Sequence, residues 1–287
     1  MDIIFPQIIV ALVILILFFV TFKQDKTKIT TKEMVVIALL CVLTAVLSKA
    51  LSIKIPPAQP IFVISFAVAI SITIGLLFSP KLALIAGVII DIIGLLIAYS
   101  VGEASMPFLG FTLTAILACY LPSILIRTTK NFKPITLNMM IIGILVLSVV
   151  ISGLFLFSTD VISIDRMQND LTDSLRYTIM GILILISVVI SIINFVMNKK
   201  INQANGLYVT TAHLTLIVLV VEIIAHIILT SLWINIMYGV PFMIAAATRI
   251  LRSILMLPIN VTIIYLILKY IPAQYKKHLI KEDPANS

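Results

Sequence analysis

The sequence predicts an all-α polytopic membrane helical bundle. Of its 287 residues, 61% are hydrophobic and only 11% are charged, and the mean hydropathy is +1.23. Soluble globular domains carry about a quarter of their residues as charged side chains. The chain also divides into apolar segments of the length that a bilayer requires. We therefore expect an integral membrane protein without a soluble domain.

Nine segments are long and apolar enough to cross about 30 Å of hydrocarbon as helices, which takes roughly 20 residues each. They cover residues 4–22, 34–53, 61–78, 82–99, 108–126, 136–157, 177–197, 211–234 and 242–270. Several prolines fall at their boundaries, where a missing amide hydrogen is tolerated. The first segment follows Asp2 and lacks a small-residue cleavage site, so we expect a retained span and not a secretory signal.

The charges of the loops alternate from one side of the membrane to the other. The cation-rich loops carry Lys23, Lys26, Lys28, Lys32, Lys81, Arg127, Lys130, Lys133, Lys199, Lys200, Lys276, Lys277 and Lys281. The opposite loops carry mainly acidic residues, namely Asp2, Glu103, Asp160, Asp165, Asp170 and Asp173. Because cytoplasmic loops are enriched in lysine and arginine, we expect the N-terminus outside and the C-terminus in the cytoplasm of a plasma-membrane protein.

The same composition argues against several other classes of protein. The formal charge of +8 is spread over short loops and forms no basic patch for nucleic acid. No G-x-x-x-x-G-K-[ST] phosphate-binding loop occurs, so the chain does not hydrolyse ATP by that route. Cys41 and Cys119 both lie in apolar runs and support neither a disulfide framework nor a zinc site. We expect no cofactor and no metal.

Ionisable residues within spans point to functional sites, because they are costly in hydrocarbon. Asp91 lies in the fourth span, and Arg249 and Arg252 share one face of the ninth. Asp91 could neutralise one arginine in a structural ion pair, but an anionic ligand would balance the remaining positive charge. Lys49, near the outer end of the second span, could equally snorkel to the headgroups or bind that ligand.

Glu222 and His226 form an i, i+4 pair in the eighth span. Such a pair could bind a metal, but a third ligand is not evident in the sequence. A polar contact between helices is the expected role.

Aromatic residues gather near the outer ends of several spans: Tyr99, Phe108, Phe111, Trp233 and Tyr238. Residues at such positions commonly belong to an interfacial belt. Trp233 and Tyr238, however, lie in a run that also carries Thr230 and Asn235, and lipid-facing surfaces rarely have so many hydrogen-bonding groups. This density favours a slot in which a ringed ligand stacks.

The second span carries a stripe of small residues, Ala38, Cys41 and Ala45. Small residues at this spacing allow two helices to approach closely. Packing within the chain is the simpler expectation, and docking to a separate membrane subunit is the alternative.

Five stretches together resemble the substrate-binding S component of energy-coupling factor (ECF) vitamin transporters, in particular its folate-type members. They are Ala45–Ile53, Gly87–Gly94, Gly110–Ala115, Leu229–Gly239 and Arg249–Asn260. The elements G-F-T-L-T-A and T-S-L-W are the most specific. The resemblance covers residues 34–127 and 211–270, and at three positions the chain differs from the residues common in the family, carrying Lys49, Arg252 and His226.

The resemblance implies a six-span core with three additional spans. On this division the segments are residues 1–33 (an additional N-terminal span and cytoplasmic loop), 34–134 (the first four core spans), 135–210 (a two-span insertion), 211–271 (the last two core spans) and 272–287 (a cytoplasmic tail). It also implies partners: a separate transmembrane coupling subunit and two ATPase subunits. Ala38, Cys41 and Ala45 would then be the docking face.

The resemblance further implies that a folate-like vitamin is captured from outside. The pterin ring would donate to Asp91, and the aromatic planes would stack on Phe108, Trp233 or Tyr238. The anionic glutamate tail would bind Arg249, Arg252 and Lys49. Thr112 and Asn235 would fix its orientation. The loops at 54–60, 100–107 and 235–242 are expected to cover the ligand.

Several alternatives to folate capture remain open from the sequence. Pantothenate is anionic but has no ring for Trp233, and thiamine is a cation that two buried arginines disfavour. A metal-dependent intramembrane enzyme using Glu222 and His226 is a second class. A non-catalytic membrane assembly subunit is a third.

Overall fold

The computed structural model confirms an all-α polytopic membrane bundle. It describes residues 4–49, 53–54, 63–100, 102, 107–158, 161–164, 167–170, 173–201, 209–275 and 279. The helices are α1 (Ile4–Gln24), α2 (Thr31–Lys49), α3 (Ala67–Leu77), α4 (Pro80–Ser100), α5 (Leu109–Thr128), α6 (Pro134–Ser158), α7 (Asp173–Ile201), α8 (Thr211–Val221), the π-helix η1 (Glu222–Leu229), α9 (Thr230–Tyr238), α10 (Phe242–Tyr270) and the 3₁₀ turn η2 (Ala273–Tyr275). Two short hairpins are added, β1 (Ile53–Lys54) with β2 (Val63–Ile64) and β3 (Val161–Ile164) with β4 (Met167–Asp170).

Seven helices in the described part of the chain are long and apolar enough to span a membrane. One of them comprises α8, η1 and α9, from Thr211 to Tyr238, and its middle part is π-helical. The two shorter apolar stretches are Ala67–Leu77 and Arg176–Ile192, the second of which lies inside α7. Every segment predicted to span therefore contains a helix.

The prediction of a spanning helix over 61–78 is wrong in its first part. Val63 and Ile64 form strand β2, which pairs with β1, and α3 begins only at Ala67. Just before this start, the hydroxyl of Ser65 accepts the backbone N–H of Ala67 at 3.2 Å and donates to Leu47 O at 3.0 Å. At about 1.5 Å per residue, the 11 residues of α3 cover roughly half the thickness of the hydrocarbon core.

The chain divides into two compact units. Unit 1 contains residues Met1–Ile124 and Val221–Arg249, and unit 2 contains Leu125–Val220 and Ile250–Ser287. This division differs from the segments suggested by the sequence, because the first predicted span belongs to the same unit as most of the predicted core. Each unit is described by itself.

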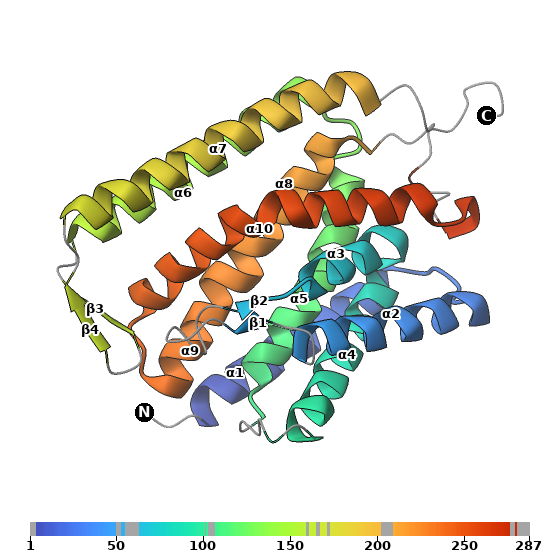
Figure 1. Ribbon diagram of the computed structural model, residues 1–287. Coiled ribbons are helices and arrows are strands. Elements are labelled where there is room, and N and C mark those ends of the chain that lie inside the picture. The colour runs from blue at the N-terminus through green and yellow to red at the C-terminus, as the bar shows by residue number, and fades with distance from the viewer. Residues whose placement is uncertain are drawn as a thin grey trace. The chain divides into compact units, whose positions relative to one another are not determined.

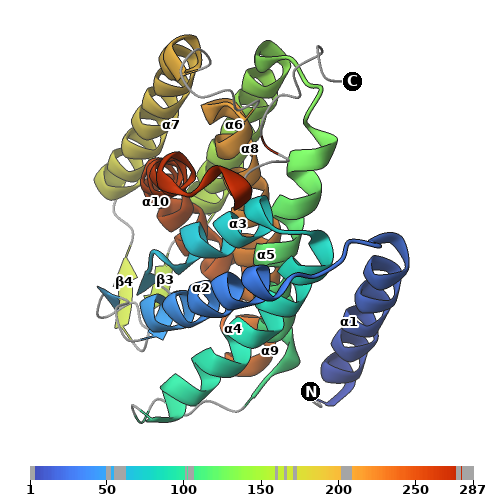
Figure 2. The same ribbon diagram turned by 90° about the vertical axis from the view of Figure 1, so that its right-hand side faces the viewer.

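In unit 1, α2, α3 and α4 lie against one another, as Figure 2 shows. Cys41 and Ala45 on α2 are fully buried, and Cys41 Sγ lies 3.7 Å from the carbonyl oxygen of Ala86 on α4. This packing corrects the docking prediction for Cys41 and Ala45, since their face is already covered within the unit. Ala38 is exposed.

Gly87 sets the distance between α4 and α5. A Cβ at this position would collide with the backbone of α5, namely the Cα of Ile116 and, at 2.8 Å, the oxygen of Ala115. Only glycine allows the two helices to approach this closely.

The connection between α1 and α2 is fixed to the start of α4. Asp25 Oδ2 accepts the backbone N–H of Lys81 at 3.1 Å, while its Oδ1 accepts the N–H and the hydroxyl of Thr27. At the start of α2, Thr30 and Glu33 form a capping box, in which each side chain bonds the backbone N–H of the other residue.

In unit 2, α6 and α7 run side by side in opposite directions (Figure 1). The segment between them was predicted only as an acidic loop, but it contains the β3–β4 hairpin, with register pairs from Val161↔Asp170 to Ile164↔Met167. Helix α7 is also tied to α8, where Thr215 Oγ1 donates to Asn194 Oδ1 at 2.8 Å. His213 on α8 bonds Thr129 O at 3.1 Å.

Candidate functional site

A short polar contact at membrane depth in unit 1 joins α4 to α5. Thr112 Oγ1 donates a hydrogen bond to Asp91 Oδ2 at 2.6 Å, and both side chains are partly buried. Asp91 lies nine residues from the end of α4 at Ser100, or roughly 14 Å along the helix. The hydroxyl therefore orients a carboxylate well inside the span, and the sequence had predicted both residues as ligand-binding.

Trp233 forms a second contact with α5. Its Nε1 donates to Thr114 Oγ1 at 3.2 Å, and its ring meets Phe108 edge to face, with centroids 5.6 Å apart. Trp233 is only 5% exposed and Phe108 3% exposed. Gly110 makes room for both rings, because a Cβ there would collide with Phe108 and lie 2.6 Å from Trp233 Cδ2.

These two contacts lie on nearly opposite faces of α5. Successive helical residues are rotated by about 100°, so Thr112 and Thr114 point about 200° apart. Ile116 follows Thr112 by one turn and packs on Gly87, while Gly110 precedes Thr114 by one turn and packs on Trp233. Helix α5 thus separates Asp91 from Trp233, and the two do not line one slot as the sequence analysis had expected.

The first helix covers the aromatic side of α5. Val10 is buried in one cluster with Phe108, Leu113 and Trp233, and Ile14 packs against that cluster. Helix α1 therefore packs against Phe108 and Trp233, two of the rings that the sequence analysis expected to stack on a ligand. In this unit these two rings are part of the hydrophobic core.

Arg249 is deeply buried, at 6% exposure, and is the one buried cation among the described side chains of unit 1. It lies seven residues from the start of α10 at Phe242, or about 10 Å along the helix. Arg252 is half-buried and belongs to unit 2. The boundary between the units thus falls between the two arginines, which the sequence had placed together on one face.

Asn235 stabilises the turn that ends α9. Its side-chain Nδ2 donates to Val240 O at 2.8 Å, and its backbone carbonyl accepts the N–H of Gly239, which has a φ of +69°. A left-handed residue after a helix is usually glycine, because it has no Cβ to clash. Tyr238 in the same turn is half exposed and available to a ligand.

Lys49 and two of the predicted covering loops lie partly or wholly outside the described residues. Lys49 is the last residue of α2, and its side chain lies outside the described part of the structure. The predicted covering loop at 54–60 and most of the one at 100–107 lie outside it as well.

Glu222 and His226 both lie on the π-helix η1, whose eight residues interrupt the long span. Glu222 is buried. The five-residue hydrogen-bond spacing of a π-helix also occurs just after η1, where the Thr230 hydroxyl donates to the carbonyl of Ala225 at 2.8 Å. Among the described residues, no three histidine, cysteine, aspartate or glutamate side chains are grouped closely enough to hold a metal ion.

Thr114 and Val10 are important to this region but were not singled out from the sequence. For Thr114 a signal existed, because Gly110 and Thr114 are four residues apart and must share a face of α5. For Val10 there was none, since one apolar residue in an apolar helix resembles the next.

No protein-family model matches the chain, and no curated protein matches it.

Proposed function

We propose that this chain is the membrane substrate-capture subunit of an ATP-driven uptake transporter of the ECF type. In this role it binds folate, or a related anionic aromatic vitamin, from outside the cell. The observation that carries the proposal is the oriented Asp91 carboxylate, held by Thr112 within a span of the unit that also buries Arg249. Charged residues at this depth are expensive and mark ligand pathways.

The chemistry of such a ligand suits these two groups. A carboxylate oriented by a hydroxyl accepts adjacent N–H donors of a ring such as pterin, and a buried guanidinium forms charge-assisted hydrogen bonds with a carboxylate tail. In this proposal Asp91, Thr112 and Arg249 recognise the ligand, and Tyr238 contributes a ring. Trp233 and Phe108 hold α5 in place from its other face.

Energy for uptake would come from partners, because the sequence has no P-loop. A separate transmembrane coupling subunit and two ATPases would drive the change that releases the vitamin inside. A ligand alone shifts a conformational equilibrium only by its difference in affinity for the two states. The proposed setting is the plasma membrane, with the N-terminus outside and the C-terminus in the cytoplasm, as the loop charges favour.

The experiment that tests this function is mass spectrometry of the small molecules retained by detergent-purified protein. It is followed by direct titration with folate, pantothenate, thiamine and riboflavin. We expect a pteridine in the retained fraction and binding of folate in preference to the others. Binding of pantothenate alone would replace the substrate, and no binding of any vitamin would contradict the proposal.

One observation favours a second candidate, a metal-dependent intramembrane enzyme. Glu222 and His226 share a π-helix, and such segments occur frequently at functional sites. This candidate predicts one bound metal per chain by elemental analysis, and loss of that metal in Glu222→Gln. Metal-free protein that still binds a vitamin would exclude it.

A further inference from the structure

A small pocket lies among α7, α8 and α10, and all of its lining residues belong to unit 2. Its volume is about 130 Å³, below the roughly 300–1,000 Å³ of sites that enclose a whole drug-sized ligand. Thr262, one of the lining residues, is exposed, so the pocket is open at α10. A pocket of this size suits one part of a larger molecule, the rest of which stays outside.

The lining combines apolar surface with hydrogen-bonding groups. Ile190, Leu257 and Val261 supply much of the apolar part. The polar lining residues are Asn194, Thr211, Thr215, Thr262 and Tyr265. An occupant that is apolar at one end and polar at the other matches this mixture.

Asn194 brings an oriented donor to the pocket. Its side chain is only 6% exposed, and its Oδ1 accepts the Thr215 hydroxyl at 2.8 Å, which fixes the carboxamide. Its Nδ2 has no hydrogen-bond partner among the described residues, and unlike Ser187 Oγ it is not closed off completely inside the chain. An amide nitrogen carries two N–H donors, and leaving them unpaired away from water is costly.

Tyr265 provides a second donor, from a different helix. Its side chain is partly buried, and its hydroxyl has no partner within the described part of the chain. Thr262 differs in this respect, because it donates to the carbonyl of Pro258 at 2.7 Å within α10. The free donors of the pocket therefore come from α7 and α10, and an acceptor is the group that would satisfy them.

The pocket lies at the level where helices leave the hydrocarbon core. The apolar stretch of α7 ends at Ile192, two residues before Asn194, and the span that starts at Thr211 starts in the pocket. Tyr265 is five residues from the end of α10 at Tyr270, or about 8 Å along the helix. The ester carbonyls of glycerolipids lie at this boundary, between the acyl chains and the headgroups.

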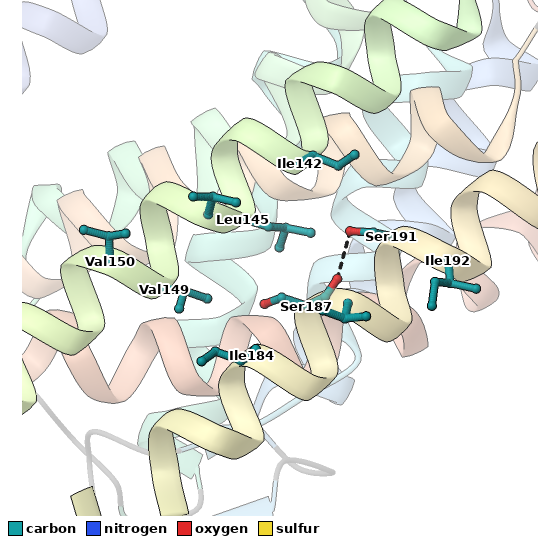
Figure 3. Close-up of a pocket in the computed structure, with 10 residues that line it drawn as sticks. Ile142, Leu145, Val149, Val150, Ile184, Ser187, Ser191 and Ile192 are labelled. Atoms are coloured by element: carbon teal, nitrogen blue, oxygen red, sulfur yellow. Dashed lines mark hydrogen bonds between the residues drawn. The ribbon is translucent and has the colours of Figure 1, made fainter. Parts of the chain in front are cut away.

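The groove between α6 and α7 is a useful contrast (Figure 3). It is wider, at about 420 Å³, but its lining is aliphatic except for two serines. Ser191 donates to the carbonyl of Ser187 at 2.9 Å, and Ser187 Oγ is enclosed within the chain. Neither serine presents a free donor to that groove, so acyl chains alone suit it.

We propose that the pocket of α7, α8 and α10 binds one acyl ester group of a glycerophospholipid. The ester carbonyl has two lone pairs and accepts from Asn194 Nδ2 and from the Tyr265 hydroxyl, while the first methylene groups of the chain lie against Leu257 and Val261. Lys269 follows Tyr265 by one turn on the same face and is exposed, which places a cation near the lipid phosphate. The inference does not depend on the proposed vitamin-capture function.

The test is native mass spectrometry of the full chain, purified in a detergent that has no ester group. The protein is titrated with phosphatidylglycerol that carries ester-linked chains and with the analogue that carries the same chains through ether links. The two lipids differ only in their carbonyl groups. We expect one tightly retained lipid per chain, and about tenfold tighter binding of the ester form.

Two pairs of variants locate the bound carbonyl. Tyr265→Phe removes only a hydroxyl and should reduce the ester preference about threefold, whereas Tyr270→Phe, on the same helix but 76% exposed and outside the pocket, should leave it unchanged. Asn194→Leu should reduce the preference at least as much. Its control is Thr215→Val, which breaks the same contact between α7 and α8 but keeps the amide donor.

Three results would overturn the inference. One is equal affinity for the ester and ether lipids. Another is an ester preference that stays at the parent value in Tyr265→Phe, because this nearly isosteric change keeps the test valid even where Asn194→Leu does not fold. The third is parent protein that retains no phospholipid, which would leave the pocket to water or to another protein.

Discussion

Asp25 Oδ2 and the backbone N–H of Lys81 lie 3.1 Å apart, although 56 residues separate them in the chain. This bond places a carboxylate at the N-terminus of α4, where the helix dipole favours negative charge. Partial burial would raise the pKa of Asp25, but hydrogen bonds from the Thr27 side chain and from the backbone of Lys81 and Thr27 outweigh it, and the pKa is lowered from its ordinary value.

Asp25→Asn is expected to destabilise the protein at pH 7. A lowered folded-state pKa means that the carboxylate stabilises the fold above its unfolded pKa of about 3.9, and that this contribution is lost as the pH falls through the folded value. Loss of a helix-capping carboxylate costs about 1 kcal/mol, or roughly 2–4 °C in Tm for a chain of this size.

Thermal unfolding in detergent between pH 3 and pH 7 checks this prediction. The difference between Asp25→Asn and the parent protein should shrink toward the acid end. Asp173→Asn is the control, because Asp173 is exposed and its contact with Arg176 is long at 4.0 Å. A difference between Asp25→Asn and the parent that grows on acidification would contradict the assignment.

Gly87→Ala should separate α4 from α5. The new methyl group would meet the backbone of Ile116 and Ala115, which cannot rotate away as a side chain can. We expect a loss of about 1–3 kcal/mol or more, measured by urea or thermal unfolding.

Gly143→Ala on α6 is the matched control for that substitution. A Cβ at Gly143 meets no atom within 4 Å, and alanine favours helix over glycine by roughly 0.5–1 kcal/mol. Its stability should therefore stay equal or rise. Equal effects of the two substitutions would show that Gly87 is not a packing site.

Thr112→Val and Thr114→Val separate ligand recognition from packing. The first removes the donor to Asp91 and should weaken folate binding about tenfold with little change in stability. The second leaves the buried indole of Trp233 without its acceptor and should cost about 1 kcal/mol of stability. Its affinity should change by less than about twofold, the change that roughly 0.4 kcal/mol produces.

Titration with labelled folate and thermal unfolding of both variants provide the measurements. The two residues lie two positions apart on one helix, so each serves as the control for the other. A ligand site on the Trp233 face of α5 would reverse the pattern of affinities. That result would restore the stacking slot expected from the sequence.

Arg249→Ala should weaken binding of an anionic vitamin by roughly 10- to 150-fold, the value of a lost hydrogen bond to a charged group. Arg249→Lys should recover part of this loss, because it keeps the charge but not the bidentate geometry. Arg127→Ala is the control, since Arg127 is exposed at the end of α5. Unchanged affinity in Arg249→Ala, with the fold intact, would remove Arg249 from the proposed site.

The sequence determined that this protein is a membrane bundle and where almost all of its helices lie. Each apolar segment of about 20 residues must satisfy its own backbone hydrogen bonds in lipid, and this requirement is local to the segment. In the described residues the helix prediction failed at the end of 34–53 and at the start of 61–78, where apolar composition alone could not distinguish strands β1 and β2 from helix.

The tertiary structure alone decided how each helix is rotated about its own axis, and so which of its residues face which neighbour. Cys41 and Ala45 face α4, and Asp91 and Trp233 meet opposite faces of α5, although both had been predicted to contact the same ligand. When nearly every residue is apolar, hydropathy scarcely changes around the helix axis and does not indicate which face of the helix points toward the core. The rotation is set by close contacts with residues far away in the chain, such as Gly87 against Ile116 and Gly110 against Trp233.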